Sequence, residues 1–243
     1  MQRISLGLDC PTSWLEQVQP LADYDYVLVD KALRDKAYLN YFKNSNRPKI
    51  LNNRVLLGWE PLPLDRIKEV WDTLGGVVIS PDWMWDSSRT FGAYEECCKA
   101  FGEKNVIGVL QGVTLSDIDT CLRLYGGKIA LPFDLGSKKE ETVQVKMGRR
   151  LVVVDIFETR RKIHLLGLTN PKELESYRYS DAVESLNTGL PILLALQGQD
   201  IGGYDEEKKR SSYHSMDMDN PSLSYETLKL VEANVEYIRR LLD

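Results

Sequence analysis

The sequence predicts a single (β/α)8 barrel, and three observations support that prediction. Short apolar runs rich in β-branched residues recur along the chain, and we count about eight of them. Segments with the apolar spacing of amphipathic helices separate these runs, which is typical of repeated βα units. The length of 243 residues suits one such barrel, since the fold needs roughly 250 residues. We therefore expect one domain over residues 1–243.

The apolar runs mark the expected strands, and the segments between them mark the expected helices. Strands are expected at 4–8, 26–29, 49–51, 77–79, 106–110, 128–131, 163–166 and 182–186. Helices are expected at 11–18, 31–42, 64–74, 91–101, 115–125, 140–159 and 171–177. An amphipathic helix over 224–242 follows the last strand. The polar, glycine-bearing stretch 197–222 is too long for an ordinary connection, so we expect it to be an active-site loop.

Composition excludes several classes of protein. With 43% hydrophobic and 28% charged residues, the chain has the profile of a globular domain rather than a disordered or fibrous one. Its longest apolar runs, 151–156 and 190–196, fall far short of the roughly 18 residues that cross a bilayer. The N-terminus enters a strand-like run without a signal-peptide pattern, so we expect a cytoplasmic protein without a membrane partner.

Signatures of metal, cofactor and ester chemistry are also missing from the sequence. Four cysteines and two histidines lack metal-ligand spacing, so we expect neither a disulfide framework nor a structural zinc. No P-loop, no dinucleotide-binding glycine motif and no G-x-S-x-G occurs, and we expect no cofactor. His164 lies in an apolar strand and Cys97 and Cys98 in a predicted helix, so all three are expected in the core.

In a barrel of this kind the reacting groups project from the carboxyl ends of the strands. The residues at those positions are mostly carboxylates and amides, namely Asp9, Asp30, Asn52, Asn53, Asp82, Gln111, Gly112, Asp134, Gly167, Glu184 and Asn187. Helix caps account for some carboxylates individually, but the fold predicts that the group converges on one mouth. Such a site suits hydrogen bonding to a polar heterocycle and stabilisation of positive charge on a sugar ring.

Basic residues gather in clusters although the formal net charge is -5. The clusters that concern function are Arg149 with Arg150, then Arg160, Arg161 and Lys162, then Lys208, Lys209 and Arg210. Charge runs usually form solvated faces. The alternative is a surface that contacts the phosphates of a nucleic acid.

Five segments at the strand ends form a recognisable order. They read ILNN at 50–53, SPDWMWDSSRT at 80–90, GVLQGVT at 108–114, HLLGLTNPKEL at 164–174 and DAVESLNTGLP at 181–191. In this order and spacing they resemble the tRNA-guanine transglycosylase superfamily. The nearest branch is that of the DpdA proteins, which act on DNA and insert 7-deazaguanine bases. The resemblance implies a (β/α)8 barrel that extrudes a nucleotide from DNA and breaks its glycosidic bond.

The resemblance also implies roles for individual residues. Asp82 matches the base-reading aspartate of the family, Gln111 and Gly112 match its base-binding glutamine and glycine, and Gly167 falls in the segment that lines the pocket. Nearby tryptophans can stack on a flipped base or simply pack in the interior, namely Trp59, Trp83 and Trp85. The zinc-binding cysteines of the tRNA-acting members are missing, which favours the DNA branch.

Two positions depart from the family pattern. Asn52 stands where the family has its general-base aspartate, and Asn187 stands where it has the covalent nucleophile. An amide is neither a useful base nor a good nucleophile at pH 7. One explanation is hydrolysis assisted by a remaining carboxylate, Asp82, Glu184 or Asp9. A second is a shifted register that makes Glu184 or Asp181 the nucleophile. A third is a binder without activity, or a chain whose two aspartates have been replaced.

We expect a DNA glycosylase that excises a modified base, leaves an abasic site and releases the free nucleobase. The alternatives are a base-exchange transglycosylase with a free base as co-substrate, and a DNA-binding protein without catalysis. An enzyme acting on an unrelated sugar or nucleoside remains a further interpretation. In the DNA-dependent alternatives the basic clusters would contact phosphates and offset the cost of base flipping.

Overall fold

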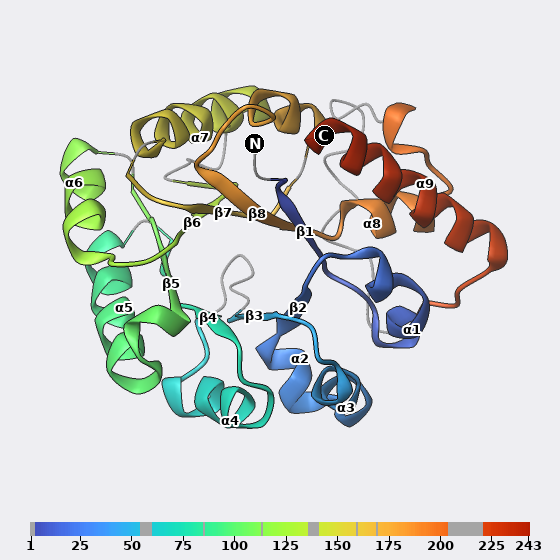
Figure 1. Ribbon diagram of the computed structural model, residues 1–243, viewed down its shortest axis with the longest axis horizontal. Helices are drawn as coiled ribbons and strands as arrows, with labels where there is room; N and C mark the ends of the chain where they lie inside the picture. Colours follow the sequence, from blue (N-terminus) through green and yellow to red (C-terminus); the bar gives the residue numbers. More distant parts are fainter. Residues whose placement is uncertain are drawn as a thin grey trace.

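The fold is an eight-stranded, near-closed parallel barrel with helices on its outside, which confirms the predicted (β/α)8 class (Figure 1). A computed structural model of the chain describes residues 3–53, 60–84, 86–112, 114–135, 141–158, 160–168, 170–203 and 221–243. The sheet order is β1-β8-β7-β6-β5-β4-β3-β2, so strands adjacent in the chain are adjacent in the sheet. All strand ends of one polarity therefore meet at one mouth of the barrel.

The predicted strands are confirmed, with ends that differ by a few residues. They are β1 Ser5–Leu8, β2 Asp25–Leu28, β3 Lys49–Asn52, β4 Val77–Ile79, β5 Val106–Val109, β6 Ile129–Pro132, β7 Ile163–Leu166 and β8 Val183–Thr188. β8 ends at Thr188 rather than at residue 186, because its pairing with β1 continues to the partners Leu8 and Thr188. This extension places Asn187 inside a strand.

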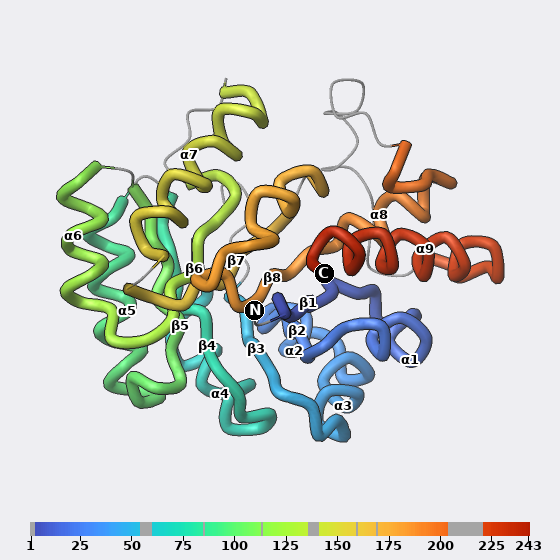
Figure 2. The backbone as a smooth tube through the Cα atoms, turned by 45° about the horizontal axis from the view of Figure 1, so that its top comes forward, coloured from blue at the N-terminus to red at the C-terminus, as the bar shows by residue number. Residues whose placement is uncertain are grey.

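Most helices also follow the prediction. They are α1 Leu15–Val18, α2 Val29–Arg34, α3 Lys36–Asn44, α4 Leu64–Leu74, α5 Ser87–Phe101, α6 Leu115–Leu124, α7 Val143–Phe157, α8 Leu190–Leu196 and α9 Tyr225–Leu242. Short 3-10 helices are η1 Thr12–Trp14, η2 Gln19–Leu21, η3 Glu103–Asn105, η4 Pro171–Ser176 and η5 Ile201–Gly203. Helices α8 and α1 both lie beside the long C-terminal helix α9 (Figure 2). No helix within the described ranges is long and apolar enough to span a membrane.

Three helical expectations need correction. The helix expected over 31–42 is divided at Asp35, whose carboxylate accepts from the backbone N–H groups of Ala37 and Tyr38 and so caps α3. The helix expected over 171–177 is the 3-10 helix η4, and α8 was not expected. Of the predicted loop 197–222, residues 204–220 lie outside the described part of the chain, so that prediction stays open.

The barrel has an outer core between strands and helices and an inner core that fills its lumen. Lumen residues form their own cluster, made of Tyr24, Tyr26, Leu28, Ile50, Ile79, Ile107, Val109 and Ala130. Alternate strand residues face outward and join the helices in a second, larger cluster. His164 is fully buried, as expected, and stacks beside Tyr26 with ring centroids 6.5 Å apart. The lumen is therefore packed, with a polar side chain at its centre.

The seam between β1 and β2 closes through side chains in addition to backbone bonds. The two strands meet at an isolated bridge between Gly7 and Tyr24. Asp23 donates its N–H to the carbonyl of Leu6 at 2.7 Å, and its carboxylate accepts the Leu6 N–H at 2.8 Å. A Cβ on Gly7 would come within 2.4 Å of the Tyr24 ring. Glycine at position 7 thus lets Tyr24 cross the seam and donate to the carbonyl of Leu186 at 2.7 Å.

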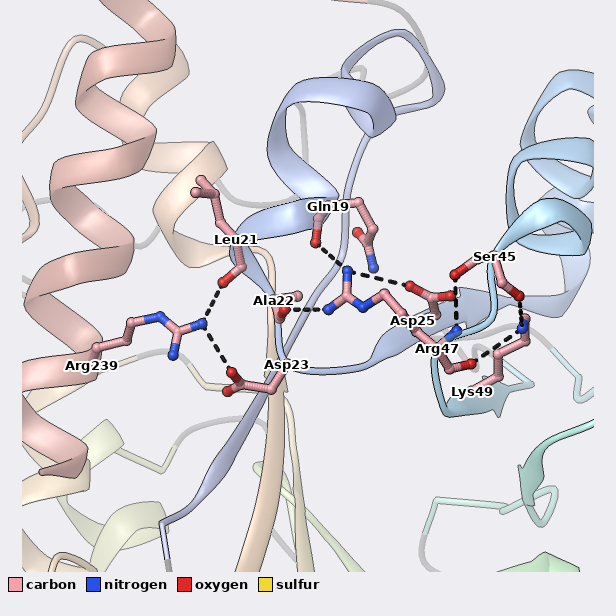
Figure 3. A network of polar contacts seen from close by, with 9 residues as sticks. All are labelled: Gln19, Leu21, Ala22, Asp23, Asp25, Ser45, Arg47, Lys49 and Arg239. Carbon is pink, nitrogen blue, oxygen red and sulfur yellow. Dashed lines mark hydrogen bonds and ion pairs between the residues drawn. The ribbon is translucent and has the colours of Figure 1, made fainter.

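Two arginines hold the segment that leads into this seam (Figure 3). Arg47 donates to the carbonyl oxygens of Gln19, at 2.8 Å, and of Ala22, and it pairs with the buried carboxylate of Asp25 at 3.6 Å. Arg239 of α9 donates to the carbonyl of Leu21 at 2.6 Å and to Asp23 at 3.1 Å. Charged groups from distant parts of the chain therefore tie the open edge of the barrel together.

Replacing Arg47 by methionine should lower the free energy of unfolding by about 2–3 kcal/mol, since Asp25 is left as a buried charge without its cation. Denaturant titration measures this loss. The matched control is Lys68→Met, which breaks the exposed pair of Lys68 with Asp72 and should cost less than about 1 kcal/mol. Equal losses in the two variants would contradict the proposed importance of the seam.

Candidate active site at the carboxyl mouth of the barrel

A cavity of about 290 Å³ opens at the carboxyl ends of the strands. Seven of the residues predicted to converge there line it, namely Asp9, Asn52, Asp82, Gln111, Asp134, Gly167 and Asn187. Side chains that the sequence did not single out complete the wall, namely Tyr26, Leu28, Met84, Pro132, Phe133 and Leu166. The cavity wall therefore combines polar and apolar side chains, as in pockets that bind and orient small ligands.

The central polar feature of the wall is the pair formed by Asp82 and Gln111. Gln111 Nε2 donates to Asp82 Oδ2 at 2.5 Å. The carboxylate can only accept, so this bond sets the orientation of the Gln111 amide. Gln111 is 3% exposed, and its Oε1 has no hydrogen-bond partner among the residues that the structure describes. A buried acceptor of this kind is costly unless a ligand or water satisfies it.

Burial raises the pKa of Asp82 from its ordinary value of 3.8 to about 6. Desolvation is the largest cause, and the hydrogen bond from Gln111 opposes it. A carboxyl group with a pKa near neutrality can gain or lose a proton during a reaction, which is a common property of active-site carboxylates.

Asn187 is held by two donors that both bind its side-chain oxygen. The N–H of Gly167 donates to Oδ1 at 3.2 Å, and Nε2 of His164 lies 3.2 Å from the same atom. Within the described ranges, the amino group of Asn187 has no partner, and the residue lines the cavity. Position 187 therefore presents N–H donors to a ligand instead of an oxygen.

The other strand-end residues divide between the wall and its support. Asn52 lines the cavity and donates to the hydroxyl of Tyr26. Asn53 is buried behind the wall, where its Oδ1 accepts from the Leu62 N–H at 2.9 Å. Asp30 pairs with Arg34 at 3.0 Å instead of lining the cavity. Gly112 has φ +106°, and a Cβ there would lie 2.5 Å from the carboxylate of Asp117, which caps α6.

Glu184 is not placed at this mouth. It lies near the start of β8, lines a separate cavity at the amino ends of the strands and pairs with Lys128 at 2.6 Å. The register between β7 and β8 shifts here, so that Ile163 pairs with Val183 and His164 with Ser185. Glu184 and Asp82 therefore line cavities at opposite ends of the barrel and cannot contact one ligand. Asp181, the other nucleophile considered, precedes β8 and lines a separate groove, so neither residue replaces Asn187 at this mouth.

The predicted phosphate contacts are only partly compatible with the geometry. Arg160, Arg161 and Lys162 precede β7 and line an open groove with residues 126–128 and Asp181. These residues precede strands β6 and β8, so the groove lies at the end of the barrel opposite the carboxyl mouth. Arg161 donates to the carbonyls of Tyr125 and Leu122, and Lys162 to that of Asp181. This cluster consequently caps the amino ends of the strands and does not serve the mouth.

Arg149 and Arg150 are neighbours with different environments. Arg149 lies half-buried on α7 and pairs with Glu141 at 2.6 Å. Arg150 is 0% exposed, so the prediction that it binds DNA phosphate is wrong. It pairs with the buried Glu173 at 3.3 Å and donates to the carbonyl of Gly167 at 2.9 Å. Arg150 thus supports the cavity wall from behind.

A lysine side chain lies at the rim of the cavity. Lys146, on the first turns of α7, forms an ion pair with Asp134 and lies 5.8 Å from the centroid of the Phe133 ring. Both partners line the cavity. In the sequence Lys146 belongs to the basic cluster that contains Arg149 and Arg150, but the pattern of charges did not assign it to the cavity.

No protein-family model matches this chain, and no curated protein matches it. Function is therefore inferred from the barrel and its mouth. The described ranges hold no cluster of His, Cys, Asp or Glu able to bind a metal ion. The predictions for Trp59, Trp85, Lys208, Lys209 and Arg210 concern residues outside the described ranges and stay open.

Proposed function

We propose that the protein is a DNA glycosylase that hydrolyses the N-glycosyl bond of a modified nucleotide, releasing the base and leaving an abasic site. The observation that carries the proposal is the Asp82–Gln111 pair in the mouth cavity, with an unsatisfied acceptor on Gln111. The resemblance of the strand-end segments to the transglycosylase superfamily supports the same chemistry. The fold supports it as well, because active sites of such barrels lie at this mouth.

Base recognition follows from the acceptors on the wall. Gln111 and Asp82 both line the cavity and both carry acceptor oxygens, so they suit a heterocycle edge with adjacent N–H donors, such as a ring N–H beside an exocyclic amine. At about 290 Å³ the cavity is near the lower limit of ligand pockets, which are roughly 300–1,000 Å³. That size suits a single flipped nucleotide.

Hydrolysis is favoured over base exchange by the environment of Asn187. Its oxygen is occupied by His164 and Gly167, and an amide would not form the covalent sugar intermediate that exchange requires. In the proposed step, the oxygen of water bonds to the sugar C1′, the bond from C1′ to the base nitrogen breaks, and that electron pair stays on the base nitrogen. The base then takes up one proton from solvent, and the proton that water gives to Asp9 returns to solvent. Asp9, on the cavity wall, accepts the proton of water, while Asp82 binds the base.

DNA is the proposed polymer, and its phosphates would approach the rim cations. Among the described residues, Lys146 and Arg149 lie on the part of α7 that contacts Asp134, which lines the cavity, and Leu135 beside it. Lys208, Lys209 and Arg210 remain predicted phosphate contacts. Because phosphate contacts release counterions, binding should weaken as salt rises. Affinity that does not change with salt would argue against a DNA ligand.

The test is to incubate the protein with DNAs carrying different modified bases and to measure released bases by mass spectrometry and abasic sites by alkali cleavage. Release from at least one DNA, lost in Asp82→Ala and kept in Glu184→Gln, is the expected result. Glu184→Gln is the matched control because that carboxylate lies at the opposite mouth. Incorporation of an added free base would establish exchange instead, and intact binding without release would establish an inactive binder.

A further inference from the structure

The lumen contains a hydrogen-bonded chain that reaches the candidate site from inside the barrel. His164 Nδ1 lies 2.9 Å from the hydroxyl of Ser185, and Nε2 lies 3.2 Å from Oδ1 of Asn187. Ser185 lines the cavity at the amino mouth, whereas Asn187 lines the cavity at the carboxyl mouth. His164 therefore connects the two ends of the lumen without touching the ligand cavity itself.

The tautomer of His164 follows from its neighbours. The backbone N–H of Gly167 can only donate, so the Asn187 atom that it contacts at 3.2 Å is the oxygen. Nε2 of His164, which faces the same oxygen, must then carry the hydrogen. Nδ1 is left as an acceptor, and the hydroxyl of Ser185 donates to it. Each polar atom in the hydrogen-bonded series Ser185–His164–Asn187 is thus assigned as either donor or acceptor without conflict.

The surroundings keep the ring neutral. Burial lowers the pKa of His164 from 6.5 to about 3, and the positive charges of Lys128 and Arg150 act in the same direction. The hydrogen bond to Asn187 opposes them. The rings of Tyr24 and Tyr26 pack against the imidazole at 6.4 and 6.5 Å. The imidazole consequently takes up no second proton near neutral pH, and its two hydrogen bonds hold its orientation.

We propose that His164 is a positioning residue, which holds the Asn187 carboxamide with its oxygen toward the lumen and its amino group toward the ligand cavity. This inference deepens the proposed function and rests on it for the identity of the ligand. The ligand atom next to Asn187 is then a hydrogen-bond acceptor, such as the oxygen of the attacking water or of the sugar-phosphate. The two hydrogen bonds to Oδ1 of Asn187, from His164 and Gly167, hold the amide in this orientation.

The first measurement uses the unliganded protein and needs no activity. Long-range proton–nitrogen correlation spectra of nitrogen-labelled protein distinguish the two neutral tautomers and the cation, and His214→Gln assigns the signals because the chain has two histidines. We expect the Nε2–H tautomer, unchanged between about pH 5 and pH 8. An Nδ1–H tautomer, or a cation at about pH 6, would overturn the proposal.

The second measurement follows the side-chain amide signals of Asn187 in variants. His164→Leu removes both hydrogen bonds and should shift and broaden these signals, whereas His164→Gln, which can both donate and accept, should restore them. If His164→Leu does not fold, Ser185→Ala provides the test instead, because it removes the hydroxyl that donates to Nδ1 of His164. Signals of Asn187 that are the same in all variants would overturn the proposal, even for a protein without glycosylase activity.

A double-mutant cycle separates positioning from a purely structural role in the active enzyme. His164→Leu should slow base release roughly tenfold to a hundredfold, as for a misplaced active-site group. In an Asn187→Ala background, His164→Leu should add almost nothing, because the residue acts through Asn187. Val109→Ala, another fully buried lumen change, should give the same factor in both backgrounds. Additive effects of His164 and Asn187 would overturn the proposal.

Discussion

Replacing Arg150 by methionine should lower the free energy of unfolding by about 3–5 kcal/mol. The change leaves the carboxylate of Glu173, which is 1% exposed, without its cation in the interior. It also removes the donor to the Gly167 carbonyl. Tyr177 continues to donate to Glu173 at 2.9 Å but cannot neutralise a charge. Denaturant or thermal unfolding measures the loss, and failure to fold would agree with it.

Two further variants make this prediction specific. Arg149→Met removes the neighbouring arginine, whose pair with Glu141 is only half-buried, so it should cost about 1 kcal/mol or less. The double variant Arg150→Met with Glu173→Leu should regain part of the loss, since no unpaired charge remains inside. A double variant as unstable as Arg150→Met alone would show that the unpaired carboxylate is not the cause.

Replacing Asp82 by asparagine should abolish most base release and yet stabilise the protein above pH 6. The folded pKa of Asp82, about 6, lies above its ordinary value of 3.8, so the folded chain binds more protons between these values. Stability of the unmodified protein therefore falls as pH rises through that window. Asparagine carries no charge, so the variant avoids a cost of up to about 3 kcal/mol at pH 8.

Unfolding curves of both proteins at about pH 4 and pH 8 measure this effect, and the gain should vanish at the lower pH. Base release should fall by roughly a hundredfold or more, since the amide would turn a donor toward the N–H groups of the base. In the unmodified enzyme, kcat/KM should rise through about pH 6 as Asp82 ionises. If kcat/KM of Asp82→Asn still rose through about pH 6, ionisation of Asp82 would not be the cause, and the proposed role of Asp82 would be wrong.

The relation between Arg149 and Arg150 shows what a pattern of charges can and cannot predict. Adjacent residues on a helix point about 100° apart, so one side chain of such a pair can face solvent while the other is buried. Which one is buried depends on the rotation of α7 against the barrel. That rotation is set by packing of Val153, Val154 and Phe157. The sequence therefore predicted a phosphate contact where the structure has an internal ion pair.

Glu184 and Asn187 show the same division at the level of a strand. The sequence assigned both residues to the carboxyl mouth, although Glu184 lies inside the expected strand 182–186. In the structure Glu184 is near the start of β8 and lines the cavity at the amino ends of the strands. Asn187 was correctly assigned because it lies near the carboxyl end of β8. Glu184 was not, because a residue near the start of a parallel strand faces the opposite mouth.

The sequence by itself determined the barrel, its strand order and the convergence of Asp82, Gln111 and Asn187. Those features follow from local periodicity and from the rule that parallel strands present their carboxyl ends together. Only the tertiary structure decided the orientation of the Gln111 and Asn187 amides, the tautomer of His164 and the burial of Arg150. The physical reason is that hydrogen-bond direction and desolvation depend on partners far apart in the chain, such as Gly167 and Asn187.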